Sequence, residues 1–382
     1  MMRVTIAIDS FKGSLSSLEA GLAAKEGVLS VYPDASVTVF SVADGGEGTT
    51  NAIVTANRGE SVSLTVSDPL GRQIEASYGY IPHRKTAVIE MAAASGITLV
   101  KPLERDIMKA STYGTGEMIR DAINRGCRDF IIGIGGSATN DGGVGMLEAL
   151  GFAFLNAEGR PISRGAGGLS ELSEIRVENA MRELAECRFT VACDVKNPLC
   201  GENGCSAVFA PQKGAVAEQI AEMDGDLKRY AALTKTRFPS ADASLPGAGA
   251  AGGMGFALMT YLGAEPVAGV ELVMREIGLE EAIEASDVVI TGEGRLDGQS
   301  AMGKVPFGVA QLAKKHGKTC VAFSGAVTDG AEILNHYGID AFFPILRKIC
   351  TLDEAMDREN ACRNLQKTVA QAFRLIKIMK GD

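Results

Sequence analysis

The chain has 382 residues, of which 46% are hydrophobic and 22% are charged, and its net charge is −9 at pH 7. This length favours two domains, and the composition is that of a folded protein rather than a disordered chain. The absence of a basic block argues against nucleic acid or an anionic membrane as a partner. Neither a signal peptide nor a membrane-spanning apolar run is visible, so we expect a cytoplasmic protein.

The N-terminal part alternates strands and helices, which is the pattern of a parallel sheet. Its predicted strands are residues 3–8 and 36–43, and its predicted helices are residues 16–29 and 48–57. Leu18, Leu22 and Leu29 give the first helix an apolar stripe that we expect to be buried.

The middle part has a different character. Residues 61–81 alternate with period two around turn signals, which predicts an antiparallel hairpin. Further strands are expected at 130–135 and 189–195, and Thr115 is expected to cap a helix. The predicted helices of this part are residues 116–125, 144–151, 215–233 and 256–262.

The α/β alternation returns near residue 286. Predicted strands and helices follow in the order 287–292, 305–316, 319–325, 329–336, 340–346 and 351–379. We therefore predict an α/β protein with a discontinuous, doubly wound, mainly parallel Rossmann-like domain and an inserted α/β domain with mixed strands. The expected boundaries are 1–65 plus 285–382 for the first domain, and 66–284 for the inserted domain.

Several predicted strands end in acidic residues or glycines. These ends are residues 9–10, 44–48, 135–143, 194, 291–297 and 324–325. The carboxyl ends of parallel strands meet at one edge of a sheet, where ligands bind. Glycine-rich turns bind phosphate through backbone N–H groups, carboxylates hold Mg²⁺, and lysine neutralises transferred charge. Together, these ends predict a site that handles phosphate.

Each feature also has a plainer explanation. A glycine after a strand is often only a turn, and an aspartate there is often a helix cap. Lys12, Lys213 and Lys304 could be ordinary surface lysines. The P-loop and protein-kinase motifs are absent. Residues 133–138 and 247–252 match dinucleotide-binding glycine patterns, but neither has the expected flanking sequence.

Histidine and cysteine are uninformative. The three histidines lie away from the glycine-rich segments, and no C-x-x-C occurs among the eight cysteines. We therefore expect reduced thiols, no zinc and no Ser-His-Asp chemistry.

Seven segments resemble the bacterial glycerate kinase type 1 family. They are residues 8–14, 43–49, 90–96, 133–143, 192–195, 247–255 and 290–297, and the resemblance runs from residue 3 to about 375. Ile8 is a departure, because the family often has proline there. The resemblance implies a two-domain fold and ATP-dependent phosphorylation of D-glycerate, typically on the 2-hydroxyl.

On this basis we expect ATP and Mg²⁺ at the glycine-rich strand ends and D-glycerate between the domains. The predicted catalytic residues are Asp194, Lys12 and Asp9, and the predicted metal ligands are Glu293 and Asp297. The predicted substrate contacts are Ser10, Asp44, Gly45, Gly46, Glu47 and Asn197. The predicted nucleotide contacts are Gly135, Gly136, Ser137, Asn140, Asp141, Gly292, Gly294 and Lys304.

Asp194 is the preferred proton acceptor, because it ends a buried strand and is followed by Lys196 and Asn197. A helix cap is its alternative role. Two other functions stay open for the whole chain, namely a non-catalytic nucleotide-binding regulator and a nicotinamide-dependent oxidoreductase of a small hydroxy-acid. A homodimer is also left open.

Overall fold

The computed structural model describes residues 1–46, 48–301 and 303–381. Its α/β architecture, with one parallel and one mixed sheet, confirms the predicted fold class. The chain forms two compact units. Unit 1 comprises residues 1–44, 51–56 and 270–382, and unit 2 comprises residues 45–50 and 57–269. In the described part of the chain, no helix is long and apolar enough to cross a membrane.

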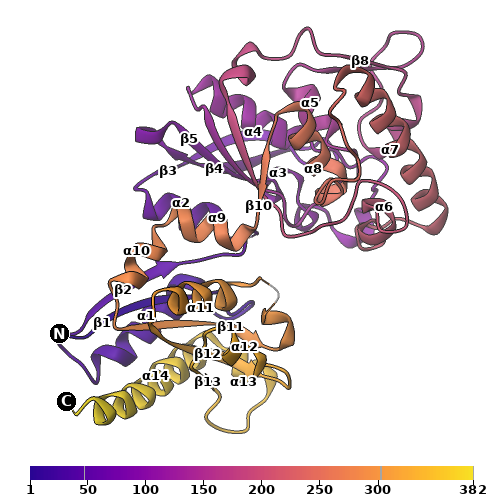
Figure 1. Ribbon diagram of the computed structural model, residues 1–382. Coiled ribbons are helices and arrows are strands. Elements are labelled where there is room, and N and C mark those ends of the chain that lie inside the picture. The colour runs from indigo at the N-terminus through magenta and orange to yellow at the C-terminus, as the bar shows by residue number, and fades with distance from the viewer. Residues whose placement is uncertain (47, 302, 382) are drawn as a thin grey trace. The chain divides into compact units, whose positions relative to one another are not determined.

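Unit 1 contains a five-stranded sheet in which every neighbouring pair is parallel (Figure 1). Its strand order is β13 (Ala341–Pro344), β12 (Thr319–Val327), β11 (Val288–Leu296), β1 (Arg3–Ile8) and β2 (Ser36–Ser41). The first strand and the strand near 290, which were expected in one domain, are neighbours in this sheet, with Val4 in register with Val288. From the adjacent β1 and β11, the chain proceeds to opposite edges of the sheet.

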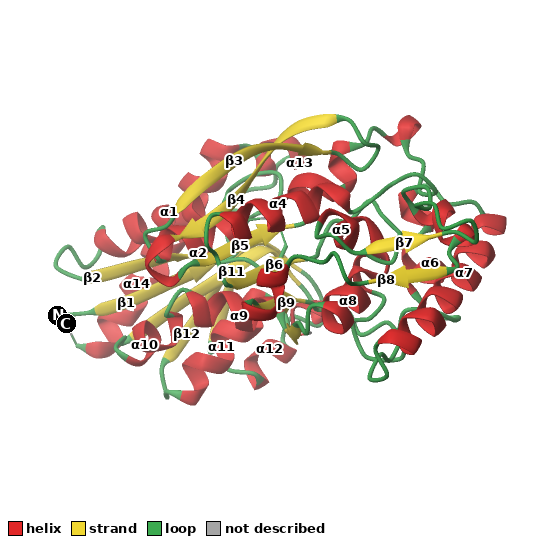
Figure 2. Ribbon diagram, turned by 90° about the horizontal axis from the view of Figure 1, so that it is seen from above, coloured by secondary structure: helices red, strands yellow, loops and turns green. Residues whose placement is uncertain are grey.

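Helices cover both faces of this sheet (Figure 2). α1 (Ser17–Leu29) and α14 (Arg358–Lys380) pack on one face, and α11 (Val305–Lys315) packs against β11 and β12 on the other. Alternate residues of each strand face opposite sides of a sheet. Accordingly, Ile6 and Ile290 join the core that contains Val369 and Phe373 of α14.

The buried face of α1 differs from the prediction. Leu18 and Leu22 are 45% and 47% exposed, whereas Gly21 and Gly27 are buried. A β-carbon on Gly27 would lie only 2.5 Å from the main-chain oxygen of Gln366 in α14. Small residues thus let the helices pack closely, and this close packing turns the predicted leucine stripe toward solvent.

Unit 2 contains a six-stranded mixed sheet. Its order is β10 (Glu265–Val267), β9 (Arg188–Ala192), β6 (Asp129–Gly133), β5 (Thr86–Glu90), β4 (Gln73–Ile81) and β3 (Glu60–Ser67). The predicted hairpin is confirmed, because β3 and β4 pair antiparallel with Val62 opposite Tyr78. β5, β6, β9 and β10 are mutually parallel, so their carboxyl ends lie at one edge.

Helices and a small second sheet complete unit 2. Its main helices are α4 (Tyr113–Asn124), α5 (Val144–Ala149), α7 (Ala217–Arg237) and α8 (Ala250–Tyr261). The predicted Thr115 cap is wrong, because α4 begins earlier and the Thr115 hydroxyl instead lies 2.8 Å from that of Ser95. β7 (Ala153–Leu155) and β8 (Glu174–Arg176) were not predicted, because three-residue strands carry almost no periodic signal.

Short helices occupy the remaining positions. They are α2 (Thr49–Ala56), α3 (Ala92–Ser95), α6 (Cys205–Phe209), α9 (Gly269–Glu276), α10 (Leu279–Glu284), α12 (Ile333–His336) and α13 (Leu352–Met356).

Candidate functional site

The turn after β1 is held by contacts to three neighbouring elements. Ser17, at the start of α1, donates its hydroxyl to the Ile8 carbonyl at 2.6 Å and accepts the Val42 N–H at 2.9 Å. The Asp9 N–H donates to the Gly292 carbonyl of β11 at 2.8 Å. These bonds place Asp9 at the carboxyl edge of the sheet, beside the end of β11.

Lys12 lies at the tip of a tight loop within this turn. Phe11 and Leu15 form an antiparallel bridge that closes the loop, and Gly13 has a φ of +78°. That backbone conformation favours glycine over other residues. The Lys12 side chain is exposed and forms no ion pair with any residue that the structure describes.

The end of β11 approaches both β12 and the β1 turn. A β-carbon on Gly292, whose φ is +157°, would lie 1.9 Å from the Phe323 carbonyl oxygen, so this position requires glycine. A β-carbon on Gly294 would lie 3.3 Å from the Phe11 Cα. Gly292, a predicted nucleotide contact, therefore serves close strand packing, while Gly294 reaches the β1 turn.

A cavity of about 460 Å³ opens at this edge of unit 1. It lies where β1 and β11 are neighbours and the chain connections diverge, which is the usual ligand position in an open parallel sheet. Its volume falls within the range of small-molecule sites. Its lining includes eight predicted residues, namely Asp9, Ser10, Lys12, Asp44, Glu293, Gly294, Asp297 and Lys304.

One side of the cavity carries charges of both signs. Arg295, which was not predicted as a site residue, lies 3.6 Å from the Asp297 carboxylate. Lys304 Nζ lies 3.5 Å from Glu293 Oε2. Such mixed charge suits a ligand that combines phosphate groups with a bound cation.

Asp9 has an unusual protonation equilibrium. Burial, together with the negative charges of Asp44 and Glu293, raises the pKa of Asp9 to about 6. The Ser10 N–H, which donates to Asp9 Oδ1 at 2.7 Å, and the nearby Lys12 charge oppose this rise. A carboxylate with a pKa near neutrality can both accept and release a proton under physiological conditions.

Glu293 offers a free oxygen atom to a cation. Burial raises the pKa of this carboxyl, and its Oε1 atom is buried with no hydrogen-bond partner among the described residues. Asp297 Oδ1 is partly engaged, because it accepts the Ser300 N–H at 3.2 Å. No cluster of three potential metal ligands occurs within the described ranges. Mg²⁺ commonly needs only one or two carboxylates together with substrate phosphates, so these residues fit such an ion.

The other side of the cavity is apolar and was missed by the sequence analysis. It is formed by Phe11, Ile345, Leu346, Leu352, Ala355 and Met356. Five of these follow β13 or belong to α13, where no polar motif marks a site. A flat apolar ligand group could therefore lie against this side, with charged groups facing the strand ends.

The predicted residues of unit 2 lie elsewhere. Asp194 is exposed, and its Oδ1 accepts the N–H of Gly269, the first residue of α9, at 2.9 Å. This contact is the helix-capping alternative. Asn197 donates from Nδ2 to the Asn203 carbonyl at 2.9 Å. A β-carbon on Gly45 would lie 2.8 Å from the Gly269 Cα, so the loop of Gly45 and Gly46 packs tightly against the start of α9. The predicted substrate contact Glu47 lies outside the described residues.

The residues predicted to contact the nucleotide in the loop after β6 differ in how deeply they are buried. Gly135 and Gly136 are exposed and Ser137 is nearly buried, whereas Asn140 and Asp141 are fully buried. Asp141 Oδ2 accepts the Thr112 N–H at 2.8 Å and the Thr112 hydroxyl at 2.9 Å. A nucleotide contact requires a side chain that a ligand can reach, and the burial of Asn140 and Asp141 instead favours a structural role for both.

Comparisons with known proteins decide the family. Residues 4–377 match the model of the glycerate kinase family. The chain belongs to that family.

Similar proteins span the whole chain. A glycerate 2-kinase from Escherichia coli K12 is 46% identical over 378 residues, covering 98% of this chain and 99% of that protein. A glycerate kinase from Halalkalibacterium halodurans is 44% identical, covering 96% and 97%. A crystal structure from Salmonella typhimurium LT2, assigned as glycerate kinase 2, has a TM-score of 0.91 and 44% identity and covers both chains completely.

The chain is therefore an enzyme of the glycerate kinase family, as the seven motifs implied. This result supports neither the oxidoreductase nor the non-catalytic regulator. It also agrees with the mixture of lysines and carboxylates found at the carboxyl edge of unit 1.

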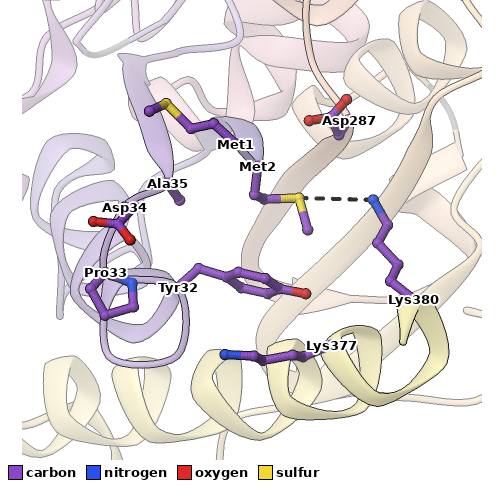
Figure 3. Close-up of a pocket in the computed structure, with 9 residues that line it drawn as sticks. All are labelled: Met1, Met2, Tyr32, Pro33, Asp34, Ala35, Asp287, Lys377 and Lys380. Carbon is purple, nitrogen blue, oxygen red and sulfur yellow. Dashed lines mark hydrogen bonds between the residues drawn. The ribbon is translucent and has the colours of Figure 1, made fainter. Parts of the chain in front are cut away.

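A second cavity, of about 550 Å³, lies at the opposite edge of the unit 1 sheet (Figure 3). It is lined by Tyr32, Asp287, Lys377 and Lys380, among others, near the amino ends of β1 and β11. None of the predicted site residues that the structure describes lines it. Ligands of open parallel sheets bind at the carboxyl ends of the strands, and the cavity beside Asp9, unlike this one, lies at that edge.

Proposed function

We propose that this glycerate kinase transfers the γ-phosphoryl group of ATP to the 2-hydroxyl of D-glycerate and so forms 2-phosphoglycerate. The observation that carries the proposal is the cavity of unit 1 in which Asp9, Lys12, Glu293 and Lys304 lie together. The name of the Escherichia coli relative, glycerate 2-kinase, supports the choice of hydroxyl.

The two sides of the cavity suit the two parts of a nucleotide. The apolar side, with Ile345, Leu352 and Met356, offers a surface for the base. The charged side offers Lys12 and Lys304 to the phosphates. Phosphoryl transfer depends mainly on positioning and charge neutralisation, which cations at the strand ends provide.

Glu293 and Asp297 are the proposed ligands of a divalent cation. The buried and unpaired Oε1 of Glu293 would gain a partner, and this gain would offset the cost of burying the carboxylate. When bound, Mg²⁺ would reduce the negative charge of the phosphates. Lys304, 3.5 Å from Glu293 Oε2, would keep this carboxylate ionised and oriented.

Asp9 replaces Asp194 as the proposed proton acceptor. Asp194 caps α9, whereas Asp9 lines the cavity and has a pKa of about 6. At pH 7 most Asp9 side chains are ionised, yet their basicity is far higher than that of an ordinary aspartate. The oxygen of the substrate hydroxyl would bond to the γ-phosphorus while ADP leaves. Asp9 would accept the proton that this hydroxyl loses.

A product assay tests the function directly. Purified protein with D-glycerate, ATP and Mg²⁺ should yield ADP and 2-phosphoglycerate in equal amounts, distinguished from 3-phosphoglycerate by ³¹P NMR. Formation of 3-phosphoglycerate alone would contradict the proposed hydroxyl. Release of ADP without any phosphoglycerate would contradict D-glycerate as the acceptor.

The metal assignment gives a separate prediction. Excess chelator should abolish activity, and added Mg²⁺ or Mn²⁺ should restore it. Glu293→Gln should raise the Mg²⁺ concentration needed for half-maximal activity at least about 10-fold, because a carboxylate ligand is lost. Glu280→Gln is a matched control in unit 1, since Glu280 is paired with Lys315 on the surface. An unchanged Mg²⁺ requirement in Glu293→Gln would remove Glu293 from the metal site.

A further inference from the structure

The turn after β6 in unit 2 presents unpaired backbone donors to solvent. Gly135 and Gly136 are exposed, and Gly136 has a φ of +73°. The Gly136 carbonyl accepts the Ile97 N–H at 2.8 Å. By contrast, the N–H groups of Gly135, Gly136 and Ser137 donate no hydrogen bond to any residue in the described ranges. Successive free N–H groups in such a turn are a common binding surface for anions.

A buried lysine lies beneath this turn. Lys213 is only 3% exposed, and its Nζ donates to Ser137 Oγ and to the Thr139 carbonyl, both at 2.7 Å. No carboxylate of the described chain lies within ion-pair distance of it. Burial lowers the pKa of Lys213 to about 8, so most of these side chains remain charged at pH 7.

The fold compensates the positive charge of Lys213 only in part. The negative charge of Asp141 favours the ammonium, but burial outweighs this effect and lowers the pKa of Lys213. Neutral donors could serve the Ser137 and Thr139 oxygens equally well. In surroundings of low dielectric constant, the field of the ammonium extends to the exposed side of the turn. The charge is therefore placed to attract an anion that the free N–H groups can hold.

Three acidic residues at or beyond the ends of β5, β6 and β9 already accept hydrogen bonds. Glu90, at the end of the adjacent β5, accepts the Thr50 N–H at 2.8 Å through Oε1. Asp194, at the end of β9, accepts the Gly269 N–H at 2.9 Å. Asp141 is enclosed by donors from Thr112, Gly143 and Gly145. These acids therefore stabilise helix starts and loops.

We propose that the turn of Gly135, Gly136 and Ser137, with the Lys213 ammonium beneath it, binds an oxyanion of a substrate. The group is the carboxylate of D-glycerate or a phosphate of the nucleotide, an identification that rests on the proposed function. Lys213 acts as a positioning residue, because it holds the turn through Ser137 and Thr139 and supplies charge without touching the anion.

Lys213→Met tests this proposal, because it keeps the length of the side chain and removes the charge. We expect the KM of one substrate to rise at least about 10-fold, corresponding to about 1.4 kcal/mol, while the KM of the other changes less than about twofold. A rise for D-glycerate identifies a carboxylate, and a rise for ATP identifies a phosphate. Lys101→Met, at an exposed lysine of the same unit, is the control.

A further variant changes the charge at the turn without altering Lys213. Gly135→Asp adds a negative charge at the exposed turn, where a β-carbon would lie 3.5 Å from the Gly46 Cα, an ordinary contact. It should raise the same KM as Lys213→Met, and it keeps the proposal testable if Lys213→Met does not fold.

The proposal is overturned if Gly135→Asp leaves both KM values unchanged, or if folded Lys213→Met does so. Calorimetric titration of the unmodified enzyme and Gly135→Asp with D-glycerate and with ADP measures binding without turnover. Failure of the unmodified enzyme to phosphorylate D-glycerate would count against the proposed function, whereas equal binding of both ligands by the two proteins would count against the turn.

Discussion

Asp9→Asn is expected to lower kcat by about 10²-fold to 10⁴-fold, the usual contribution of a general base. Asparagine has almost the same shape, and its Oδ1 can still accept the Ser10 N–H that Asp9 now accepts at 2.7 Å. The change therefore removes the proton-accepting group and leaves the turn intact. A kcat within threefold of the unmodified enzyme would exclude Asp9 as the base.

The same variant is expected to be more stable than the unmodified enzyme at pH 7 to 8. Burial raises the pKa of Asp9 from 3.8 to about 6, so the folded protein holds this proton more tightly than the unfolded chain does. Protonated Asp9 therefore contributes to the free energy of unfolding fully below pH 4, and this contribution is lost as the pH rises toward 6. Asparagine cannot ionise, so Asp9→Asn avoids this loss of stability, which amounts to up to about 3 kcal/mol. The expected sign of the gain is a higher Tm of the variant. A lower Tm would show that the variant disturbs the fold.

The pH dependence of activity gives a third observation on Asp9. Because a base must be unprotonated, kcat/KM of the unmodified enzyme should fall below pH 6 with one proton bound. This fall should be absent from the residual activity of Asp9→Asn and present in Asp34→Asn, whose carboxylate lines the other cavity of unit 1. A profile that keeps the same fall in Asp9→Asn would assign the titration to another group.

The sequence analysis located the strand ends, because short-range patterns record where an apolar strand stops and a turn begins. The continuous apolar residues of β1 and β11 predict buried parallel strands, and the glycines and acids after them mark the ligand-binding edge. That reasoning placed eight residues that line the unit 1 cavity. The apolar residues Leu352 and Met356 could not be found in this way, because they look like any helix residue.

The roles of Asp9 and Asp194 could not be separated by local sequence. Each follows a buried strand, and each could cap a helix or face a ligand. Distant parts of the chain distinguish their surroundings, since Gly269 supplies the N–H that Asp194 accepts, whereas burial, together with the charges of Asp44 and Glu293, raises the pKa of Asp9. Likewise, nothing adjacent to Lys213 in the sequence shows that it is buried beneath Ser137, which lies 76 positions earlier.

Lys12→Met is expected to lower kcat/KM by about 10²-fold, which corresponds to about 3 kcal/mol of lost transition-state stabilisation. The loop closed by Phe11 and Leu15 holds Lys12 at the cavity, and no described carboxylate pairs with it. Its ammonium is therefore available to phosphate oxygens, whose charge shifts during transfer. Lys12→Arg should recover part of the activity, because it restores the charge but not the shape.

Lys304→Met is the informative comparison, because Lys304 already lies 3.5 Å from Glu293. Its loss should chiefly weaken nucleotide and metal binding, since Glu293 would lose the cation that now lowers its pKa. We therefore expect Lys12→Met to act mainly on kcat and Lys304→Met mainly on the KM for ATP. Lys315→Met, which changes an exposed lysine paired with Glu280, should alter neither constant. A change of less than threefold in Lys12→Met would show that Lys12 is only a surface lysine at the rim of the cavity.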